Sequence, residues 1–166
     1  MLICTFAIAQ HSKNTLYLSL SSSFRGETTN TRPNSANAQT SHVRSDLFLA
    51  AKGGTFLMDQ LLFGLEAYFD QQRQQNFVPD RRIGIGLFSR LYVTDELFGG
   101  VKYLFESENT TLDDINTSKF GFIMGSSFMF NDKIAFEPEL AYLWGGNLNP
   151  VRTFSLSVGV GLFIAR

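Results

Sequence analysis

The chain has 166 residues, enough for one domain, and its net charge of −1 gives no electrostatic reason to expect nucleic-acid binding. No run of residues approaches the ~18 apolar residues that a transmembrane helix requires. Seventeen phenylalanines against one tryptophan, in a chain that is 44% hydrophobic, indicate an apolar surface that a core or a lipid phase must cover.

Residues 1–9 are interpreted as what remains of a secretory signal peptide. Residues 7–9 read Ala-Ile-Ala before Gln10, the small-x-small pattern of a cleavage site, although a charged start is missing. A short buried first strand is the alternative. Cys4, the only cysteine, lies in this segment, so residues 10–166 would form a single domain without a disulfide. We expect no cofactor and no metal site, because no phosphate loop, zinc-ligand spacing or calcium-loop pattern occurs.

Eight segments alternate apolar and polar residues with the period of two that predicts a β-strand. In the last of them, every second residue from Phe154 to Ile164 is apolar, and the residues between are mostly Ser and Gly. Such segments are close to the roughly 9–11 residues that cross a bilayer obliquely. The predicted strands are residues 14–24, 42–56, 61–71, 81–93, 97–107, 117–130, 134–145 and 151–165.

The connections between these strands alternate in length. Tight turns are predicted at residues 58–60, 94–96 and 131–133. The other connections are mostly longer and richer in Asn, Thr, Ser and Gln: residues 25–41, 72–80, 108–116 and 146–150. In an antiparallel meander alternate connections lie at the same end. One end therefore has short turns and the other polar loops, which is the asymmetry of an outer-membrane barrel.

The residue types on the two strand faces favour a membrane barrel over a soluble one. On the apolar face, aromatic residues gather near the strand ends, as in the two girdles of a membrane barrel. Those toward the loops are Phe69, Tyr103, Phe105, Phe120, Phe122, Tyr142, Trp144 and Phe154. Those toward the turns are Phe63, Phe128, Phe130 and Phe136. Between the girdles lie the aliphatic residues Leu65, Val101, Met124, Leu140 and Val158.

The opposite face is rich in Ser and Gly, which fit inside a narrow barrel. A soluble lipocalin-like barrel would carry Lys, Glu and Thr on that face instead. The sequence therefore predicts an all-β fold, an eight-stranded antiparallel up-and-down transmembrane β-barrel.

Charged residues on the small-residue face form two sets at different depths. The first set lies about four to six residues from the turns and consists of Lys52, Glu66, Arg90, Lys102, Glu137 and Glu139. A looser set nearer the loops consists of Asp70, Arg82, Glu106 and Lys119. Both sets are balanced in charge, so mutual hydrogen bonding would offset the cost of burial. We expect a structural network that plugs the lumen. A selectivity filter or proton pathway is the alternative.

The sequence shows no recognisable set of catalytic residues. His11 and His42 are the only histidines, and His42 has Ser41, Ser45 and Asp46 nearby in sequence. A lipid-modifying enzyme at the barrel rim would use such residues, but a rim histidine in solvent is the simpler interpretation. We predict that the protein is not an enzyme.

Three motifs resemble those of a known family. Residues 54–64 read Gly-Thr-Phe-Leu-Met-Asp-Gln-Leu-Leu-Phe-Gly, residues 88–92 read Phe-Ser-Arg-Leu-Tyr, and residues 128–142 read Phe-Met-Phe-Asn-Asp-Lys-Ile-Ala-Phe-Glu-Pro-Glu-Leu-Ala-Tyr. In order and spacing they resemble hairpins of small bacterial outer-membrane barrels of the OmpX/OmpW-like, porin-type superfamily. One departure is the C-terminus, where Phe163 is followed by three residues instead of ending the chain.

The strand pattern and the resemblance imply a small integral protein of the cell outer membrane with a structural or surface-binding role. Its expected partners are outer-membrane lipid, the barrel-insertion machinery and an extracellular ligand, which would meet residues 25–41, 72–80 and 108–116. No nucleic acid is expected. A narrow porin-like channel for small solutes is the alternative function.

Overall fold

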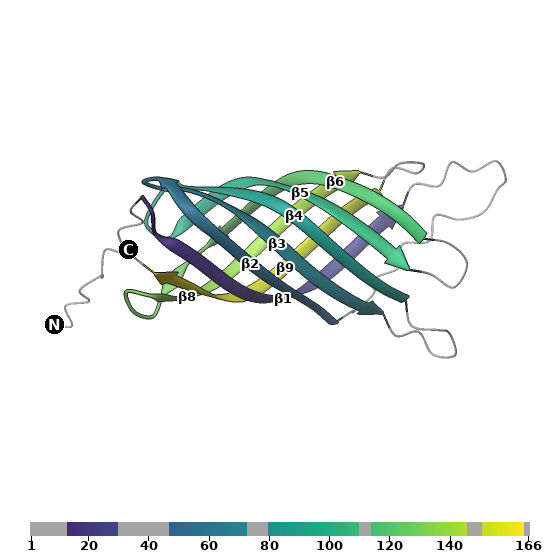
Figure 1. Ribbon diagram of the computed structural model, residues 1–166, viewed down its shortest axis with the longest axis horizontal. Helices are drawn as coiled ribbons and strands as arrows, with labels where there is room; N and C mark the ends of the chain where they lie inside the picture. The colour runs from purple at the N-terminus through teal and green to yellow at the C-terminus, as the bar shows by residue number, and fades with distance from the viewer. Residues whose placement is uncertain (1–12, 30–46, 73–79, 110–113, 146–150, 165–166) are drawn as a thin grey trace.

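The computed structural model describes residues 13–29, 47–72, 80–109, 114–145 and 151–164 (Figure 1). Regular structure in these ranges consists of β-strands joined in one antiparallel sheet. The strands are β1 (Leu16–Thr29), β2 (Leu47–Met58), β3 (Leu61–Gln72), β4 (Asp80–Tyr92), β5 (Leu97–Asn109), β6 (Asp114–Ser126), β7 (Phe128–Met129), β8 (Ile134–Gly145) and β9 (Val151–Ile164). In the described part of the chain, no helix is long and apolar enough to cross a membrane.

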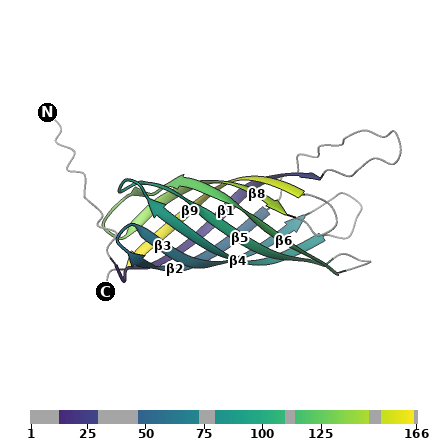
Figure 2. The ribbon, with the colours of Figure 1, turned by 90° about the horizontal axis from the view of Figure 1, so that it is seen from above.

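The sheet closes on itself. Strands adjacent in sequence pair with one another, β1 pairs with β9, and β6 pairs with β8. The short β7 follows β6 and also pairs with β8, so the nine elements make eight strands around the barrel. Closure leaves no open sheet edge, which a membrane does not tolerate. The predicted eight-stranded antiparallel up-and-down barrel is confirmed, and the two views of Figures 1 and 2 show it along its length.

The short turns lie at the end of the barrel where β1 begins and β9 ends (Figure 1). The β2–β3 turn uses Gln60 at a φ of 72°, a conformation that closes a tight hairpin. In the β4–β5 turn, the Thr94 hydroxyl accepts a hydrogen bond from the Leu97 N–H at 2.9 Å. In the turn before β8, the Asn131 side chain accepts one from the Ile134 N–H at 2.9 Å. These local side-chain acceptors fix the turns and hence the strand register.

The predicted strand 117–130 is interrupted at Ser127, which separates β6 from β7. The register is the same on both sides, because Gly125 pairs with Glu139 and Phe128 with Phe136. Continuing this register places Ser127 opposite Glu137 and Ser126 opposite Pro138, which has no N–H to donate to the ladder. On its other side, toward β5, the Ser127 N–H donates to the Glu96 carbonyl at 2.7 Å. The break therefore follows from a proline in the neighbouring strand.

Several predicted boundaries were wrong at the loop end. Strand β1 continues to Thr29 and β5 to Asn109, while β6 begins at Asp114, so parts of the predicted loops 25–41 and 108–116 are strand. The predicted start of β2 at residue 42 lies outside the described residues, which resume at Leu47. The remainder of those loops, and the predicted signal segment 1–9, lie outside the described residues.

Side chains alternate strictly between the two faces of the wall. In β8 the inward residues are buried and the outward residues are exposed, and β9 repeats the pattern. The outward positions hold large apolar side chains, such as Leu65 at 63% exposure and Met124 at 61%, whereas the inward positions hold most of the charges. This polarity is the reverse of that in a soluble barrel, and it is the polarity expected of a barrel surrounded by lipid.

Candidate functional site

The six charged residues predicted from the sequence all point into the lumen. They come from five strands: Lys52 from β2, Glu66 from β3, Arg90 from β4, Lys102 from β5, and Glu137 and Glu139 from β8. None is more than 5% exposed. Three cations and three carboxylates therefore lie in a space that bulk water does not reach.

Arg90 contacts both carboxylates of β8. Its Nη1 lies 3.2 Å from Glu137 Oε1, and its Nη2 lies 2.7 Å from Glu139 Oε2. Nη1 also donates to the Tyr17 hydroxyl at 2.9 Å, and that hydroxyl in turn donates to Glu137. The planar guanidinium can engage two carboxylates at once because its donors form a fixed fork.

Glu139 is the centre of the network, because it contacts all three cations. Lys52 Nζ donates to its Oε1 at 2.8 Å and Lys102 Nζ at 3.0 Å, while Arg90 binds its other oxygen. Lys102 also lies 2.8 Å from Glu66, and Lys52 lies 3.9 Å from the same carboxylate. Each charge thus has at least one opposite partner, which offsets the cost of removing it from water.

The network extends through hydroxyl groups toward the turn end. Ser127 donates to Glu137 Oε1 at 2.8 Å, and the Tyr92 hydroxyl lies 3.2 Å from the Ser127 Oγ. The unchanged register places Ser127 opposite Glu137, and the alternation of β6 points its side chain inward toward this carboxylate. Sequence reasoning placed Ser127 inward only as a small residue and did not single out Tyr17 or Tyr92. Tyr17 has the same parity along β1 as the inward Ser19 and Ser21, which was the available signal.

Aromatic rings surround the Arg90 guanidinium. Its Cζ lies 4.2 Å from the ring centroid of Phe98, 5.1 Å from that of Tyr17 and 5.4 Å from that of Phe88. A guanidinium is weakly hydrated and is attracted by ring faces, so these contacts add to the ion pairs. The arrangement holds Arg90 on all sides and leaves it 1% exposed.

Apolar layers close the lumen above and below the network. Toward the turns lies a cluster that includes Phe56, Leu62, Tyr92, Phe98 and Phe163. Toward the loops lies a second cluster, consisting of Phe48, Ala50, Tyr68, Leu104 and Leu143. Phe163, near the C-terminus, belongs to the first cluster, with its ring 5.3 Å from that of Tyr17. We name these the turn-side layer and the loop-side layer.

The looser charged set lies beyond the loop-side layer. Lys119 and Glu106 form an ion pair at 2.8 Å, with both side chains at most 5% exposed. Asp70 and Arg82 are paired residues on β3 and β4, and Asp70 is 1% exposed. The lumen therefore alternates apolar, ionic, apolar and ionic levels from the turn end to the loop end.

The described residues of the lumen include neither a metal-binding cluster nor a serine beside a histidine. In the described ranges, no group of three or more His, Cys, Asp or Glu side chains is placed to hold a metal ion. The hydroxyl of Ser127 is used by Glu137 and no histidine lies beside it among the described residues. The candidates for a rim enzyme, His11, Ser41, His42, Ser45 and Asp46, lie outside the described residues.

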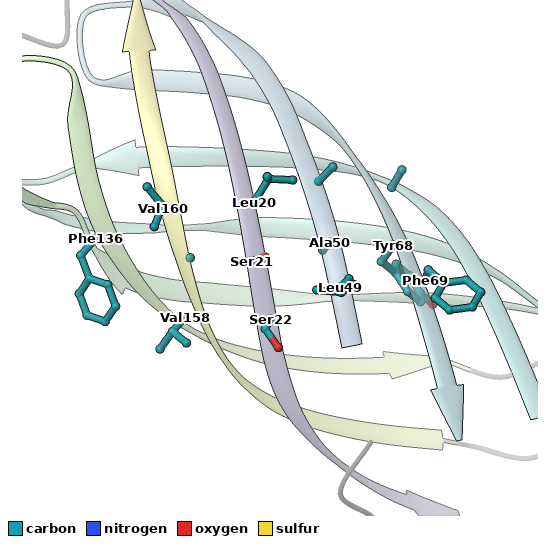
Figure 3. A pocket seen from close by; sticks show the side chains of 13 residues that line it. Leu20, Ser21, Ser22, Leu49, Ala50, Tyr68, Phe69, Phe136, Val158 and Val160 are labelled. Atoms are coloured by element: carbon teal, nitrogen blue, oxygen red, sulfur yellow. The ribbon is translucent and has the colours of Figure 1, made fainter. Parts of the chain in front are cut away.

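A depression of about 730 Å³ lies on the outer wall across β1, β2, β3 and β9 (Figure 3). It forms because small outward residues such as Ser22, Ala51 and Ala67 stand between larger ones such as Leu20 and Phe69. None of the six network residues lines it. In a bilayer its open side would face acyl chains.

Comparisons with solved structures find the same architecture. The chain aligns over 89% of its length with 96% of neisserial surface protein A, at a TM-score of 0.65 and 14% identity. It aligns over 96% of its length with all of the outer-membrane protein OprG of Pseudomonas aeruginosa, at a TM-score of 0.64 and 11% identity. It aligns over 90% of its length with 99% of the Yersinia pestis outer-membrane protein Ail, solved in a phospholipid bilayer nanodisc, at a TM-score of 0.51 and 9% identity. No family model and no curated protein matches the sequence.

At these identities the likeness shows the fold and nothing finer. The apolar exterior and the charged, buried interior are the polarity of a membrane barrel, and OprG and Ail are outer-membrane proteins. The chain is therefore a small eight-stranded membrane β-barrel with the fold of these outer-membrane proteins.

Proposed function

We propose that the protein is a non-enzymatic outer-membrane barrel with a structural or surface-binding role, whose lumen is plugged by its charge network. The observation that carries this proposal is that Lys52, Glu66, Arg90, Lys102, Glu137 and Glu139 are each at most 5% exposed. A conducting pore would keep such side chains wet, because ions cross a lumen only with water or with ligands that replace it.

The layered packing also supports a plug. The turn-side and loop-side layers separate the network from both ends of the barrel. Replacing a layer of rings and aliphatic side chains by a water-filled path would require several of them to move together, because packed interiors leave few voids. The eight strands then serve as a rigid support for the loops.

In this proposal the loops carry the specific function. The connections β1–β2, β3–β4 and β5–β6, which fall within the predicted loops 25–41, 72–80 and 108–116, would meet an extracellular ligand at the end of the barrel away from the turns. Connecting loops on a rigid scaffold commonly carry binding residues. The partners are then outer-membrane lipid around the wall, the insertion machinery during assembly, and that ligand.

Bilayer conductance tests the plug. Purified barrels inserted in planar bilayers should give no steady current above that of the lipid, and Arg90→Met should be compared under the same conditions. Insertion is checked independently by the change in gel mobility between heated and unheated samples. A steady ion-selective current from the unaltered protein, changed in selectivity by Arg90→Met, would instead establish the narrow channel.

Whole-cell proteolysis tests the topology. Protease added outside should cut within residues 30–46 and spare the turn at Asp59. Cleavage at Asp59 alone would reverse the orientation and remove the proposed role of the loops. For the rim-enzyme alternative, the measurement is lipid modification in cells carrying His42→Ala, which should equal that of cells with the unaltered protein.

A further inference from the structure

The outer wall of the barrel carries a packed aromatic cluster near its loop end. The rings of Phe120, Phe122 and Tyr142 lie 5.4, 5.5 and 6.1 Å from the ring of Trp144. All of these side chains face outward, and Trp144 is 39% exposed. Tryptophan and tyrosine on the wall of a membrane barrel lie at the level where hydrocarbon gives way to headgroups. Trp144 therefore marks the headgroup level on the loop side.

Arg152 lies beside this cluster on the same face of the wall. It pairs with Trp144 across the β8–β9 ladder, so the two side chains project from adjacent points. Arg152 is exposed, as is Phe154, the next outward residue of β9. Among the outward strand residues whose side-chain exposure the structure describes, Arg152 is the only charged one.

The charge of Arg152 contrasts with the charges inside. Each cation of the lumen network contacts a carboxylate, whereas no carboxylate among the described residues lies within ion-pair distance of Arg152. A guanidinium on a lipid-facing wall is costly in hydrocarbon and is tolerated near the interface. Its long side chain can bring the charge to the headgroup level while its methylenes stay on the apolar wall.

We propose that Arg152 and Trp144 form a binding site for a net anionic, phosphate-bearing lipid headgroup in the leaflet on the loop side. The guanidinium matches a phosphate with two parallel hydrogen bonds. The aromatic cluster and Phe154 offer the apolar wall against which the acyl chains of the same lipid would lie. Charge complementarity thus selects the headgroup, and the position of the cation at the end of the apolar belt selects a lipid over a free anion.

The single tryptophan makes the site directly observable, because all indole fluorescence comes from Trp144. The barrel is folded into phosphatidylcholine vesicles in which either the phosphatidylcholine or added phosphatidylglycerol carries brominated acyl chains, which quench a nearby indole. Preferential binding should make brominated phosphatidylglycerol quench Trp144 more than its share of the lipid explains. One basic side chain near an anionic lipid surface corresponds to a relative binding constant of about five.

Three variants distinguish binding at Arg152 from a general attraction of anionic lipid to any exposed cation. Arg152→Gln should bring the relative binding constant close to one. Lys133→Gln, which removes an exposed cation from a turn at the opposite end, should leave it unchanged. Arg152→Lys keeps the charge without the planar fork and should give an intermediate value, which keeps the test decisive if Arg152→Gln folds poorly.

Three results would each overturn the proposal, the first two in the lipid preference itself and the third in its response to phosphate. The first is a relative binding constant near one for the unaltered protein, and the second is the same preference in Arg152→Gln as in the unaltered protein. The third is loss of the preference when inorganic phosphate is added at constant ionic strength, which would identify a free anion as the ligand. Retention of the preference in phosphate buffer supports the lipid headgroup.

Discussion

The two faces of β8 show how differently the barrel treats its inside and its outside. Glu137 and Glu139 point inward and are at most 3% exposed, whereas Phe136 and Leu140 point outward and are 38% and 37% exposed. The inward residues depend on particular partners on other strands, such as Arg90 and Lys52. The outward residues depend only on being apolar at the correct depth. We therefore expect substitutions inside to be sensitive to chemistry and geometry, and substitutions outside to be sensitive to polarity and depth.

The largest effect is expected where an inner charge loses its partner. Arg90→Met should lower the free energy of unfolding by about 3–5 kcal/mol, because Glu137 loses its cation and Glu139 loses one of three. Urea unfolding in vesicles, followed by gel mobility, measures the loss. Adding Glu137→Gln to Arg90→Met should recover part of it, since residues in one network are not additive. An unchanged stability in Arg90→Met would mean that water screens these groups and that the plug is absent.

The outer face should respond to charge according to depth. Val158→Arg places a charge in the middle of the apolar belt and should cost about 2–4 kcal/mol of unfolding free energy. The matched control is Met58→Arg at the turn end, where the cost should fall to about 0–1 kcal/mol. Unfolding of both variants in the same vesicles makes the comparison. Equal losses of unfolding free energy in the two variants would argue against contact between this face and lipid.

Two adjacent glycines on β5, Gly99 on the outer face and Gly100 on the inner face, allow the two faces to be compared at almost the same depth. A Cβ at Gly100 would lie 1.9 Å from the Ser89 carbonyl oxygen, whereas a Cβ at Gly99 would meet nothing within 4 Å. Gly100→Ala should therefore cost about 1–3 kcal/mol through crowding of the backbone. Gly99→Ala should change stability by less than about 0.5 kcal/mol. Thermal and urea unfolding would contradict this assignment of faces if Gly99→Ala were the worse variant.

The smallest effect is expected at the margin of the network. Tyr92→Phe removes a hydroxyl that lies 3.2 Å from Ser127 but keeps the ring in the turn-side layer. Loss of the neutral hydrogen bond to Ser127 should itself cost about 0.5–1.5 kcal/mol. Tyr17→Phe is the companion variant, and it should cost more because the Tyr17 hydroxyl contacts both Arg90 and Glu137. If the two variants were equally stable, Tyr17 would lie outside the charge network in solution.

The sequence by itself determined the strand number, the faces and the polarity of the wall. Alternation with a period of two assigns each side chain to one face, so Glu137 and Val158 could be placed inside and outside without coordinates. The tight turns were equally local, since Thr94 and Asn131 bond to backbone groups two or three residues away. The inward position of all six network residues follows from the same local rule.

Only the tertiary structure decided which inward side chains contact one another across the lumen. Glu139 meets Lys52, Lys102 and Arg90 from three other strands because closure of the barrel and its strand stagger bring them to one level. Tyr17 joins the network from β1, 120 residues away from Glu137 in sequence. The break at Ser127 also depends on a neighbouring strand, where Pro138 cannot complete the ladder. Strand pairing and closure are non-local, so a periodic pattern along one strand carries no information about the residue that faces it from the other side of the barrel.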